Sequence, residues 1–202
     1  MSKHKTIIIG LTGPTGAGKS SLCAVLQTLG AHTIDADKIA AEMINQPDIQ
    51  RRLSAAFGNV FDDNGTLNRR RLAEKVFSSE ENVQKINAIT HPAIIREIRS
   101  KIEVFKQSGA TAVVLDAPLL FESKIDFCDC VIAVVSDPQV RLERIMERDG
   151  IDDVLASRRM RAQKENIYYT QKADYVIENN AGTTELEKEA TAVFRKIMTE
   201  EM

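Results

Sequence analysis

The sequence predicts a doubly wound α/β fold built on a parallel sheet of five strands. Two observations support this fold class: short aliphatic runs recur along the chain, and helical patterns separate them. Because the runs are apolar at successive positions rather than alternating, they are typical of parallel strands that helices cover on both faces. The five runs that we expect to be strands are Thr6–Thr12, His32–Ile34, Ala112–Asp116, Val131–Val135 and Asp174–Ile177.

Two helices beside these strands are clearly marked. The first carries an aliphatic stripe at helical spacing from Leu22 to Leu29, and Gly30 follows as a C-terminal stop. The last carries a similar stripe from Leu186 to Ile197. Such one-sided stripes predict helices that pack against the sheet.

The composition is that of an ordinary globular protein. The chain has 202 residues, and 27 Lys and Arg against 29 Asp and Glu give a formal net charge of −2. This balance argues against a protein that neutralises duplex phosphates, and no run approaches the ~20 apolar residues of a spanning helix. The spacing of Cys23, Cys128 and Cys130 indicates neither a metal nor a redox site. We therefore expect one cytoplasmic domain over residues 1–202, without nucleic acid or membrane as a partner.

Two stretches interrupt the simple alternation of strands and helices. Residues 38–110 show helical patterns and a turn at Asp63–Gly65, which predicts a helical insertion between the second and third strands. Residues 141–170 are rich in arginine, and Asp137-Pro138 before them predicts a helix start with an N-cap acceptor. We expect this second stretch to be a lid, although its interleaved acidic residues could also pair with the arginines in solvent.

The strongest motif follows the first strand and opens the first helix. It matches G-x-x-x-x-G-K-[ST], in which glycines let successive N–H groups surround a phosphate and the helix N-terminus adds positive charge. Lys19 can reach the β- and γ-phosphates, and the Ser20 hydroxyl can be a magnesium ligand. We expect ATP and Mg²⁺ as cofactors, and a nucleotide site formed by Gly13, Pro14, Thr15, Gly16, Ala17, Gly18, Lys19, Ser20 and Ser21.

The rest of the sequence favours a small-molecule kinase. The chain has no N-K-x-D segment of a switch GTPase and no L-S-G-G-Q segment of a transporter ATPase, and its D-x-x-G match, Asp62–Gly65, reads as a turn. A small-molecule kinase must hold a second substrate over the phosphates and exclude water. The insertion and the arginine-rich stretch would meet these two needs.

Carboxylates follow two of the predicted strands. Asp35 and Asp37 come after the second strand, and Asp116 ends the third. Because the carboxyl ends of parallel strands meet at one edge, these groups should face the phosphate loop and could orient an attacking hydroxyl or a magnesium-bound water. Solvated capping roles for all three stay open. His91 precedes Pro92, which we expect to start a helix, and a structural histidine is the simpler interpretation there.

Together these residues resemble the dephospho-CoA kinase family over nearly the whole chain. Beyond the phosphate loop, the specificity lies in the order and spacing of the matching segments. These are Ile9–Ser20, Asp35–Ala40, Phe57–Gly58, Gly65–Arg69, Val76–Phe77, His91–Ile94, Asp116–Glu122, Arg141–Arg144, Arg148–Gly150, Arg159 with Gln163, and Ala173–Asn180.

The resemblance implies a sheet of the P-loop kinase type and the last step of coenzyme A synthesis, in which ATP phosphorylates the ribose 3′-hydroxyl of dephospho-CoA. It implies that Asp35 is the catalytic carboxylate and that Arg141 acts with Lys19 on the transferred phosphate. Arg148 and Asn179 would contribute to the ATP site. The dephospho-CoA side would include Asp37, His91, Asp116, Pro118 and Leu119.

The chain departs from the usual family pattern at a few positions. Pro14-Thr15 stands where Gly-Ile is usual, and Pro14 has no N–H to give to a phosphate. Asn68 stands where an aspartate is usual before Arg69. Three other functions stay open: a kinase of the same fold with another nucleoside or nucleotide acceptor, a regulatory protein that hydrolyses ATP slowly, and a nucleic-acid-directed ATPase.

Overall fold

The computed structural model describes residues 5–62, 65–123 and 125–200. The chain divides into two compact units. The sheet unit comprises residues up to Asp35 and from Ile102 onward, and the helical unit comprises Ala36–Lys101.

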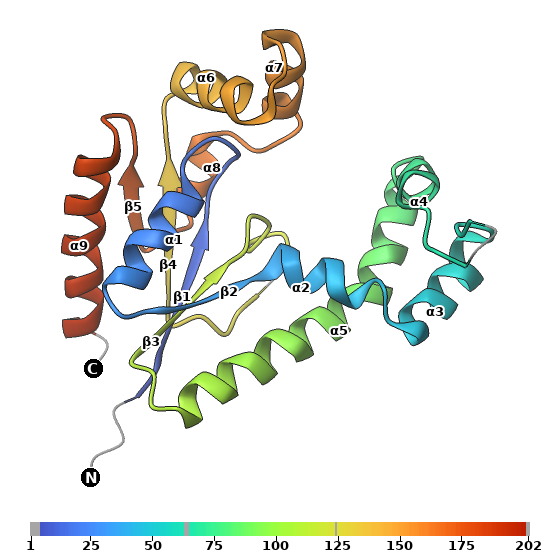
Figure 1. Ribbon diagram of the computed structural model, residues 1–202, viewed down its shortest axis with the longest axis horizontal. Coiled ribbons are helices and arrows are strands. Elements are labelled where there is room, and N and C mark those ends of the chain that lie inside the picture. The colour runs from blue at the N-terminus through green and yellow to red at the C-terminus, as the bar shows by residue number, and fades with distance from the viewer. Residues whose placement is uncertain (1–4, 63–64, 124, 201–202) are drawn as a thin grey trace. The chain divides into compact units, whose positions relative to one another are not determined.

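The sheet unit contains a five-stranded parallel sheet with the order β2-β3-β1-β4-β5 (Figure 1). Every predicted strand is present, with ends that differ from the prediction by one residue or less. The sequence-based fold class is therefore confirmed. The strands are β1 (Ile7–Thr12), β2 (His32–Asp35), β3 (Ala112–Asp116), β4 (Cys130–Val135) and β5 (Tyr175–Glu178).

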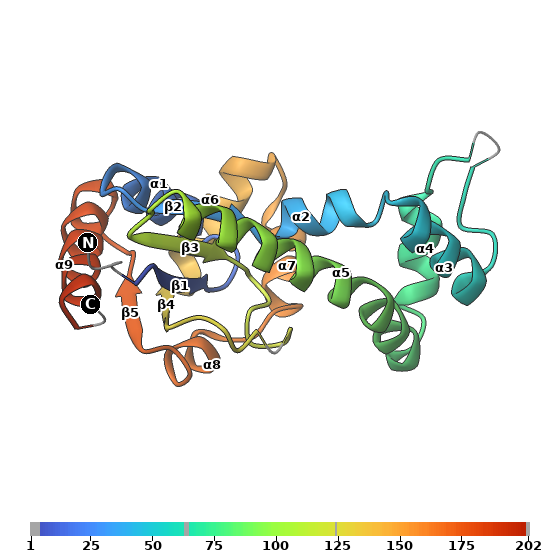
Figure 2. The same ribbon diagram turned by 90° about the horizontal axis from the view of Figure 1, so that it is seen from below.

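Helices cover both faces of this sheet. On β4, Ile132 and Val134 pack in one cluster with side chains of α1 (Lys19–Thr28) and α9 (Thr183–Glu200). Ala133 and Val135, which alternate with them, pack instead against Tyr169 of α8 (Asn166–Thr170). Since successive strand residues point to opposite faces, α1 and α8 lie on opposite sides of the sheet, as Figure 2 shows. Both faces are buried, which explains the continuous apolar runs.

The arginine-rich stretch forms α6 (Pro138–Asp149) and α7 (Asp153–Arg161), followed by α8. Asp137 is the N-cap of α6, as expected, but the prediction of a side-chain cap is wrong. The backbone N–H of Asp137 instead donates to Asn180 Oδ1 at 2.8 Å, so a contact from the end of β5 fixes this helix start. Asp152 does cap α7, because its Oδ1 accepts from Leu155 N at 2.8 Å.

The helical unit contains α2 (Ala36–Met43), α3 (Pro47–Phe57), α4 (Arg69–Val76) and the first part of α5 (Glu80–Gln107), which continues into the sheet unit. Its described residues hold one isolated antiparallel bridge, between Phe61 and Leu67. Asn68, the departure from the family pattern, caps α4 by accepting from Arg71 N at 2.9 Å, so it keeps the capping role that an aspartate would have. The predicted turn at Asp63–Gly65 has its first two residues outside the described residues.

Pro92 does not start a helix, which corrects the sequence-based expectation. It lies inside the 28-residue helix α5. A proline inside a helix removes an N–H and clashes with the preceding turn, at a cost of about 3 kcal/mol. Ile89, Ala93 and Ile98 around it are buried, so packing keeps the helix continuous where local propensity favours a break.

No helix among residues 5–62, 65–123 and 125–200 is both long and apolar enough to cross a membrane.

Candidate active site

The phosphate loop, residues Gly13–Ser20, connects β1 to α1 at the carboxyl edge of the sheet. Two of its glycines are required by close packing. A Cβ on Gly13 would lie 2.1 Å from the carbonyl oxygen of Val134, and one on Gly18 would lie 2.1 Å from Asn179 Nδ2. Both residues also have positive φ angles, 141° and 100°. The predicted motif therefore forms a tight loop followed by a helix N-terminus, an arrangement that suits an anion.

Lys19 lies across this loop. Its Nζ donates to the carbonyl oxygens of Gly13 at 2.7 Å and of Pro14 at 3.4 Å. Ser20, next to it in the first turn of α1, is exposed. The ammonium group and the helix N-terminus thus place positive charge at the point where the motif predicts phosphates.

Two carboxylates lie together at the same edge. Asp35 at the end of β2 is paired in register with Asp116 at the end of β3, and Leu11 of β1 is the partner of Asp116 on its other side. The structure thus brings Asp35 and Asp116 beside the strand that leads into the phosphate loop. Asp37, by contrast, lies in α2 and belongs to the helical unit.

Cys23 contacts one of these carboxylates, Asp116. Its Sγ lies 3.7 Å from Asp116 Oδ2, as the donor of a weak hydrogen bond. Burial, and then the negative charge of Asp116, raise the pKa of the thiol to about 12, and Asp35 adds to the effect. The spacing of the cysteines indicated neither a metal nor a redox site and did not place Cys23 beside these carboxylates. Its place four residues after Lys19, on the same helix face, is the signal that could have placed it at this edge.

Arg141 of α6 is buried against the phosphate loop, with 4% of the residue exposed. Its Nε donates to the Thr15 carbonyl oxygen at 2.9 Å, and its Nη1 donates to Asn166 Oδ1 at 3.3 Å. Burial lowers the pKa of its guanidinium group. Its Nη2 is buried and has no hydrogen-bond partner among the described residues. Because an unsatisfied buried donor is costly, this nitrogen favours an anionic acceptor beside the loop.

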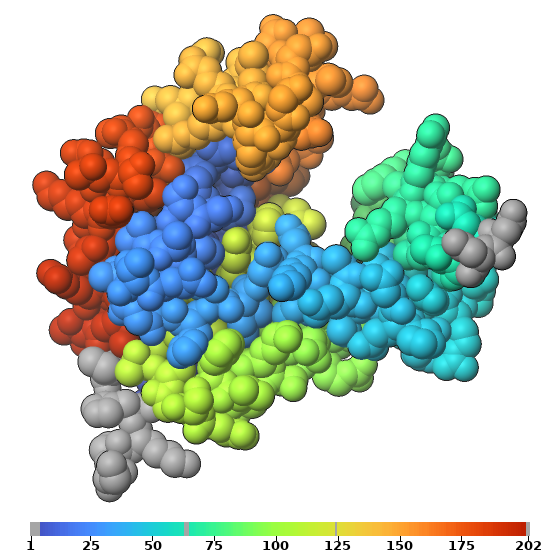
Figure 3. All heavy atoms as spheres, in the orientation of Figure 1, coloured from blue at the N-terminus to red at the C-terminus, as the bar shows by residue number. Residues whose placement is uncertain are grey.

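Arg148 also reaches the loop, but from an exposed position. Its Nη2 lies 3.4 Å from Thr15 Oγ1, while Asp149 accepts from both Nε and Nη2 at 2.8 and 3.0 Å. Asp149 accepts from Arg159 as well. The pairing of arginines with interleaved acids, left open by the sequence, is thus present together with the contact to the loop. Figure 3 shows the atoms of α6 and α7 beside those of the loop and α1.

Asn179 lies under the phosphate loop. It is buried, and its Nδ2 donates to the Ala17 carbonyl oxygen at 2.9 Å. Arg144 Nη1 donates to the carbonyl oxygen of Asn179 at 2.9 Å, and Ser136 Oγ donates to the same oxygen at 2.7 Å. This network ties the end of β5 and the start of α6 to the loop, and it explains why Asn179 and Gly18 fit so closely.

The remaining predicted substrate residues lie in different parts of the fold. The Pro118 carbonyl oxygen accepts from Thr12 Oγ1 at 3.1 Å, which fastens the segment after β3 to the end of β1. Leu119 follows and is 60% exposed. His91 belongs to α5 in the helical unit, and partial burial lowers its pKa.

The residues at this edge also fit a magnesium ion. Among the described residues, no group of three or more His, Cys, Asp and Glu side chains could hold a metal without other ligands. Mg²⁺ in phosphotransfer sites needs no such group, because it takes one or two protein oxygens and completes its shell with phosphates and water. The exposed hydroxyl of Ser20 and the carboxylates of Asp35 and Asp116 are oxygen donors of the required kind.

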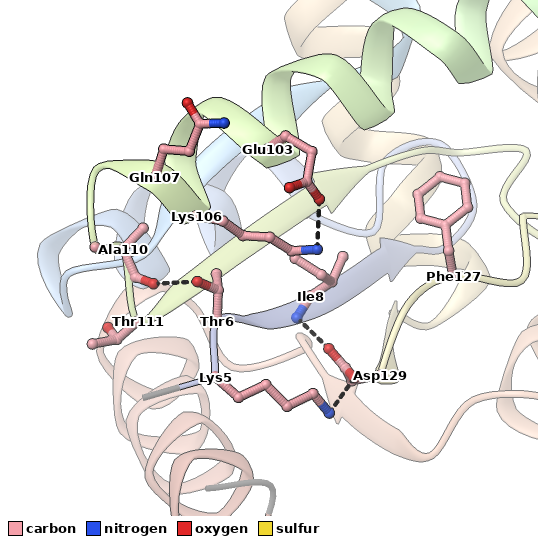
Figure 4. Close-up of a pocket in the computed structure, with 11 residues that line it drawn as sticks. Lys5, Thr6, Ile8, Glu103, Lys106, Gln107, Ala110, Thr111, Phe127 and Asp129 are labelled. Atoms are coloured by element: carbon pink, nitrogen blue, oxygen red, sulfur yellow. Dashed lines mark hydrogen bonds and ion pairs between the residues drawn. The ribbon is translucent and has the colours of Figure 1, made fainter. Parts of the chain in front are cut away.

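A separate cavity of about 730 Å³ lies at the opposite, amino edge of the sheet. Its charged side chains neutralise one another: Lys5 pairs with Asp129 at 2.6 Å and Lys106 with Glu103 at 2.8 Å (Figure 4). Asp129 also accepts from Ile8 N at 2.8 Å. The two contacts of Asp129 hold the start of β1 in place. The phosphate loop and the paired carboxylates lie at the carboxyl edge, which is therefore the candidate active site.

The sheet order and the glycine-rich loop at the end of its central strand define an α/β protein of the P-loop kinase class. Comparison with protein families identifies the particular family. The model described as "Dephospho-CoA kinase" matches residues 7–185, and the chain therefore belongs to the dephospho-CoA kinase family.

Individual relatives agree with this assignment. A dephospho-CoA kinase of Fusobacterium nucleatum is 40% identical over 184 residues, which cover 90% of this chain and 94% of the relative. A crystal structure of a protein from Thermus thermophilus is similar with a TM-score of 0.83 and 30% identity, over 95% of this chain and 98% of that one. The dephospho-CoA kinase from Campylobacter jejuni is similar with a TM-score of 0.69 and 25% identity, over 96% and 98% of the two chains.

Proposed function

We propose that the protein transfers the γ-phosphoryl group of ATP to the ribose 3′-hydroxyl of dephospho-CoA, giving coenzyme A and ADP. Membership of the dephospho-CoA kinase family supports the reaction. The observation that carries the mechanism is the pairing of Asp35 with Asp116 at the edge that holds the phosphate loop. A cationic loop and a carboxylate pair at one edge are what phosphoryl transfer to a hydroxyl requires.

ATP would bind with its phosphates in the loop Gly13–Ser20. The backbone N–H groups at the start of α1 would donate to phosphate oxygens, and the ammonium group of Lys19 would follow the charge that develops on the transferred group. Lys19 is already bound to the loop carbonyls, so little reorganisation is needed to place it. Catalysis in this half of the site is therefore positioning and charge stabilisation.

Asp35 would accept a hydrogen bond from the 3′-hydroxyl and orient its oxygen in line with the γ-phosphate. Asp116, its neighbour in the sheet, would orient water or the acceptor ribose on the other side. Ser20 would hold Mg²⁺ together with the triphosphate, and the ion would supply neutralisation of phosphate charge.

Two arginines would stabilise the negative charge of the phosphates. Arg148 is exposed beside Thr15 and would donate to the triphosphate, whereas the unsatisfied Nη2 of Arg141 favours a phosphate oxygen at the loop itself. Residues 38–110, which include Asp37 and His91, would bind dephospho-CoA. Residues 141–170 would act as a lid that covers the phosphates. A cytoplasmic location stays a prediction of the sequence.

The test measures the rate of ADP release from ATP in the presence and in the absence of dephospho-CoA. We expect ADP release to depend on dephospho-CoA and to yield a 3′-phosphorylated product. The Asp35→Asn variant should lose at least two orders of magnitude in turnover and keep its affinity for ATP, because the carboxylate acts on the acceptor. Glu189→Gln, an exposed change on α9, is the matched control and should behave as wild type.

Other outcomes separate the competing functions. If nucleosides or nucleotides are phosphorylated as fast as dephospho-CoA, the acceptor is not specifically dephospho-CoA. ADP release that is unaffected by any acceptor would indicate a regulatory ATPase, and stimulation by DNA or RNA would indicate a nucleic-acid-directed one. Near wild-type turnover in Asp35→Asn would show that Asp35 is not the catalytic carboxylate.

A further inference from the structure

Thr15, in the middle of the phosphate loop, is held at each of its polar atoms by a different side chain. Its N–H donates to Gln163 Oε1 at 2.8 Å, and its carbonyl oxygen accepts from Arg141 Nε at 2.9 Å. Its Oγ1 accepts from Arg148 Nη2 at 3.4 Å. All three partners belong to the arginine-rich stretch that follows β4, so this stretch contacts all the polar atoms of one loop residue.

The contact of Gln163 decides which backbone donors the loop presents. Pro14 has no N–H, and the N–H of Thr15 is directed to Gln163. Ala17 N donates to the Pro14 carbonyl oxygen at 3.3 Å and closes a turn, in which Gly16 has a φ of 78°. The N–H groups of Thr15 and Ala17 are therefore engaged within the protein, and the loop presents to a phosphate the N–H of Gly16 and those from Gly18 onward. The Pro14 carbonyl oxygen and the Thr15 N–H belong to the same planar peptide unit. Rotation of this unit would move both groups, so the turn keeps its form only if the unit does not rotate.

Gln163 is itself well placed to prevent that rotation. Its backbone N–H donates to the Met160 carbonyl oxygen at 3.1 Å, at the end of α7. Three residues later, Asn166 Nδ2 donates to the Ser136 carbonyl oxygen at 2.9 Å, and Asn166 Oδ1 accepts from Arg141. The short segment between α7 and α8 is thus fixed at both ends. An amide side chain is also suitable beside phosphates, because it provides the acceptor for Thr15 without negative charge.

We propose that Gln163 is a positioning residue for the triphosphate of ATP. It holds the Thr15 amide and so keeps the first turn of the phosphate loop in the form that presents the N–H groups of Gly16 and of the residues from Gly18 onward. Its action is on the loop rather than on the reacting atoms. The proposal rests on the proposed ATP site, and it assigns a role to a residue whose motif alone suggested none.

The test compares Gln163→Met, which keeps the length of the side chain and removes its acceptor, with Gln171→Met, an exposed glutamine at the end of α8. For Gln163→Met we expect the KM for ATP to rise roughly five- to tenfold, the loss expected for one hydrogen bond. The turnover number and the KM for dephospho-CoA should change less than twofold. Gln171→Met should match wild type in all three. A rise in the KM for ATP, with the KM for dephospho-CoA and the turnover number unchanged, is a readout that a general structural role would not give, because loss of structure would affect both substrates.

Direct binding of ATP separates this proposal from the proposed function. Weaker ATP binding by folded Gln163→Met supports the positioning role even if dephospho-CoA proves not to be the acceptor. Unchanged or tighter ATP binding by folded Gln163→Met overturns it, and tighter binding would mean that Gln163 competes with phosphate for the Thr15 amide. Equal increases in both KM values together with a lower Tm would also overturn it in favour of a structural role.

Discussion

At the scale of single residues, Cys23 shows how the site changes the chemistry of a side chain. Burial and the carboxylate of Asp116 raise the pKa of its thiol to about 12, and burial raises that of Cys128 to a similar value. A raised pKa means less thiolate at a given pH, and the thiolate is the nucleophile in alkylation. The thiol therefore stays protonated at neutral pH and can donate to Asp116.

We expect both cysteines to react slowly with iodoacetamide at pH 8. Even after allowing for the higher reactivity of a more basic thiolate, the rate should be on the order of a hundredfold below that of the urea-unfolded chain. Peptide mass spectrometry after timed alkylation measures each cysteine separately. Fast labelling of Cys23 in the folded protein would contradict its burial against Asp116.

Lys19 provides a second residue-scale prediction. Lys19→Ala removes the ammonium group that bridges the loop carbonyls, so we expect ATP to bind roughly 10- to 100-fold more weakly, in line with the loss of a hydrogen bond to a charged group. Turnover should fall further, because negative charge develops on the transferred group. Titration of ATP binding and steady-state rates separate the two effects. Lys188→Ala on α9 is exposed and serves as the control.

At the scale of elements, Pro92 and Pro47 occupy opposite kinds of helix position. Pro47 is at the first turn of α3, where proline is favourable, whereas Pro92 lies inside α5. We expect Pro92→Ala to raise the free energy of unfolding by about 1–3 kcal/mol, since it restores an N–H and removes a clash. Pro47→Ala should lower it by about 0.4–1 kcal/mol through the entropy of the unfolded chain. Urea unfolding followed by circular dichroism measures both, and a loss of stability in Pro92→Ala would show that α5 depends on its proline.

The sequence predicts the sheet better than the helix ends. The strands and α1 could be located because buried parallel strands are apolar throughout and because Gly30, with a φ of 96°, ends its helix locally. Pro92 was predicted to start a helix, and this prediction was wrong because tertiary packing overrides the local rule. The side-chain cap predicted at Asp137 is absent, and Asn180, more than forty residues away, accepts from the backbone N–H of Asp137. Sequence patterns describe near neighbours, and these features depend on distant ones.

The same limit applies to the site. The phosphate loop is a continuous motif, so its place between the first strand and the first helix could be predicted from the sequence. The contacts of Gln163 with Thr15 and of Cys23 with Asp116 join residues that are 148 and 93 positions apart, and only the folded chain brings them together. The proximity of Asp35 and Asp116 followed from one topological rule, that carboxyl ends of parallel strands share an edge, and their catalytic roles stay a prediction.

At the scale of the whole molecule, the net charge of −2 conceals an uneven distribution. In the sheet unit, Arg141 and Arg148 both contact the phosphate loop at Thr15, so two cationic side chains lie beside the loop. A small anion can therefore be bound without the overall positive charge that a polyanion requires. All of the contacts to the loop described above lie within the sheet unit.

This division predicts how each substrate protects the chain from hydrogen exchange. ATP should slow exchange in residues 13–21 and 141–163, because the loop and its arginine contacts belong to the sheet unit, and should leave residues 47–76 of the helical unit unchanged. Dephospho-CoA should slow exchange in the helical unit if residues 38–110 bind it. Amide exchange followed by mass spectrometry, with Lys19→Ala as the control that loses the ATP effect, measures both. Protection of residues 47–76 by ATP alone would contradict a nucleotide site confined to the sheet unit, and no protection there by dephospho-CoA would remove the substrate-binding role of the insertion.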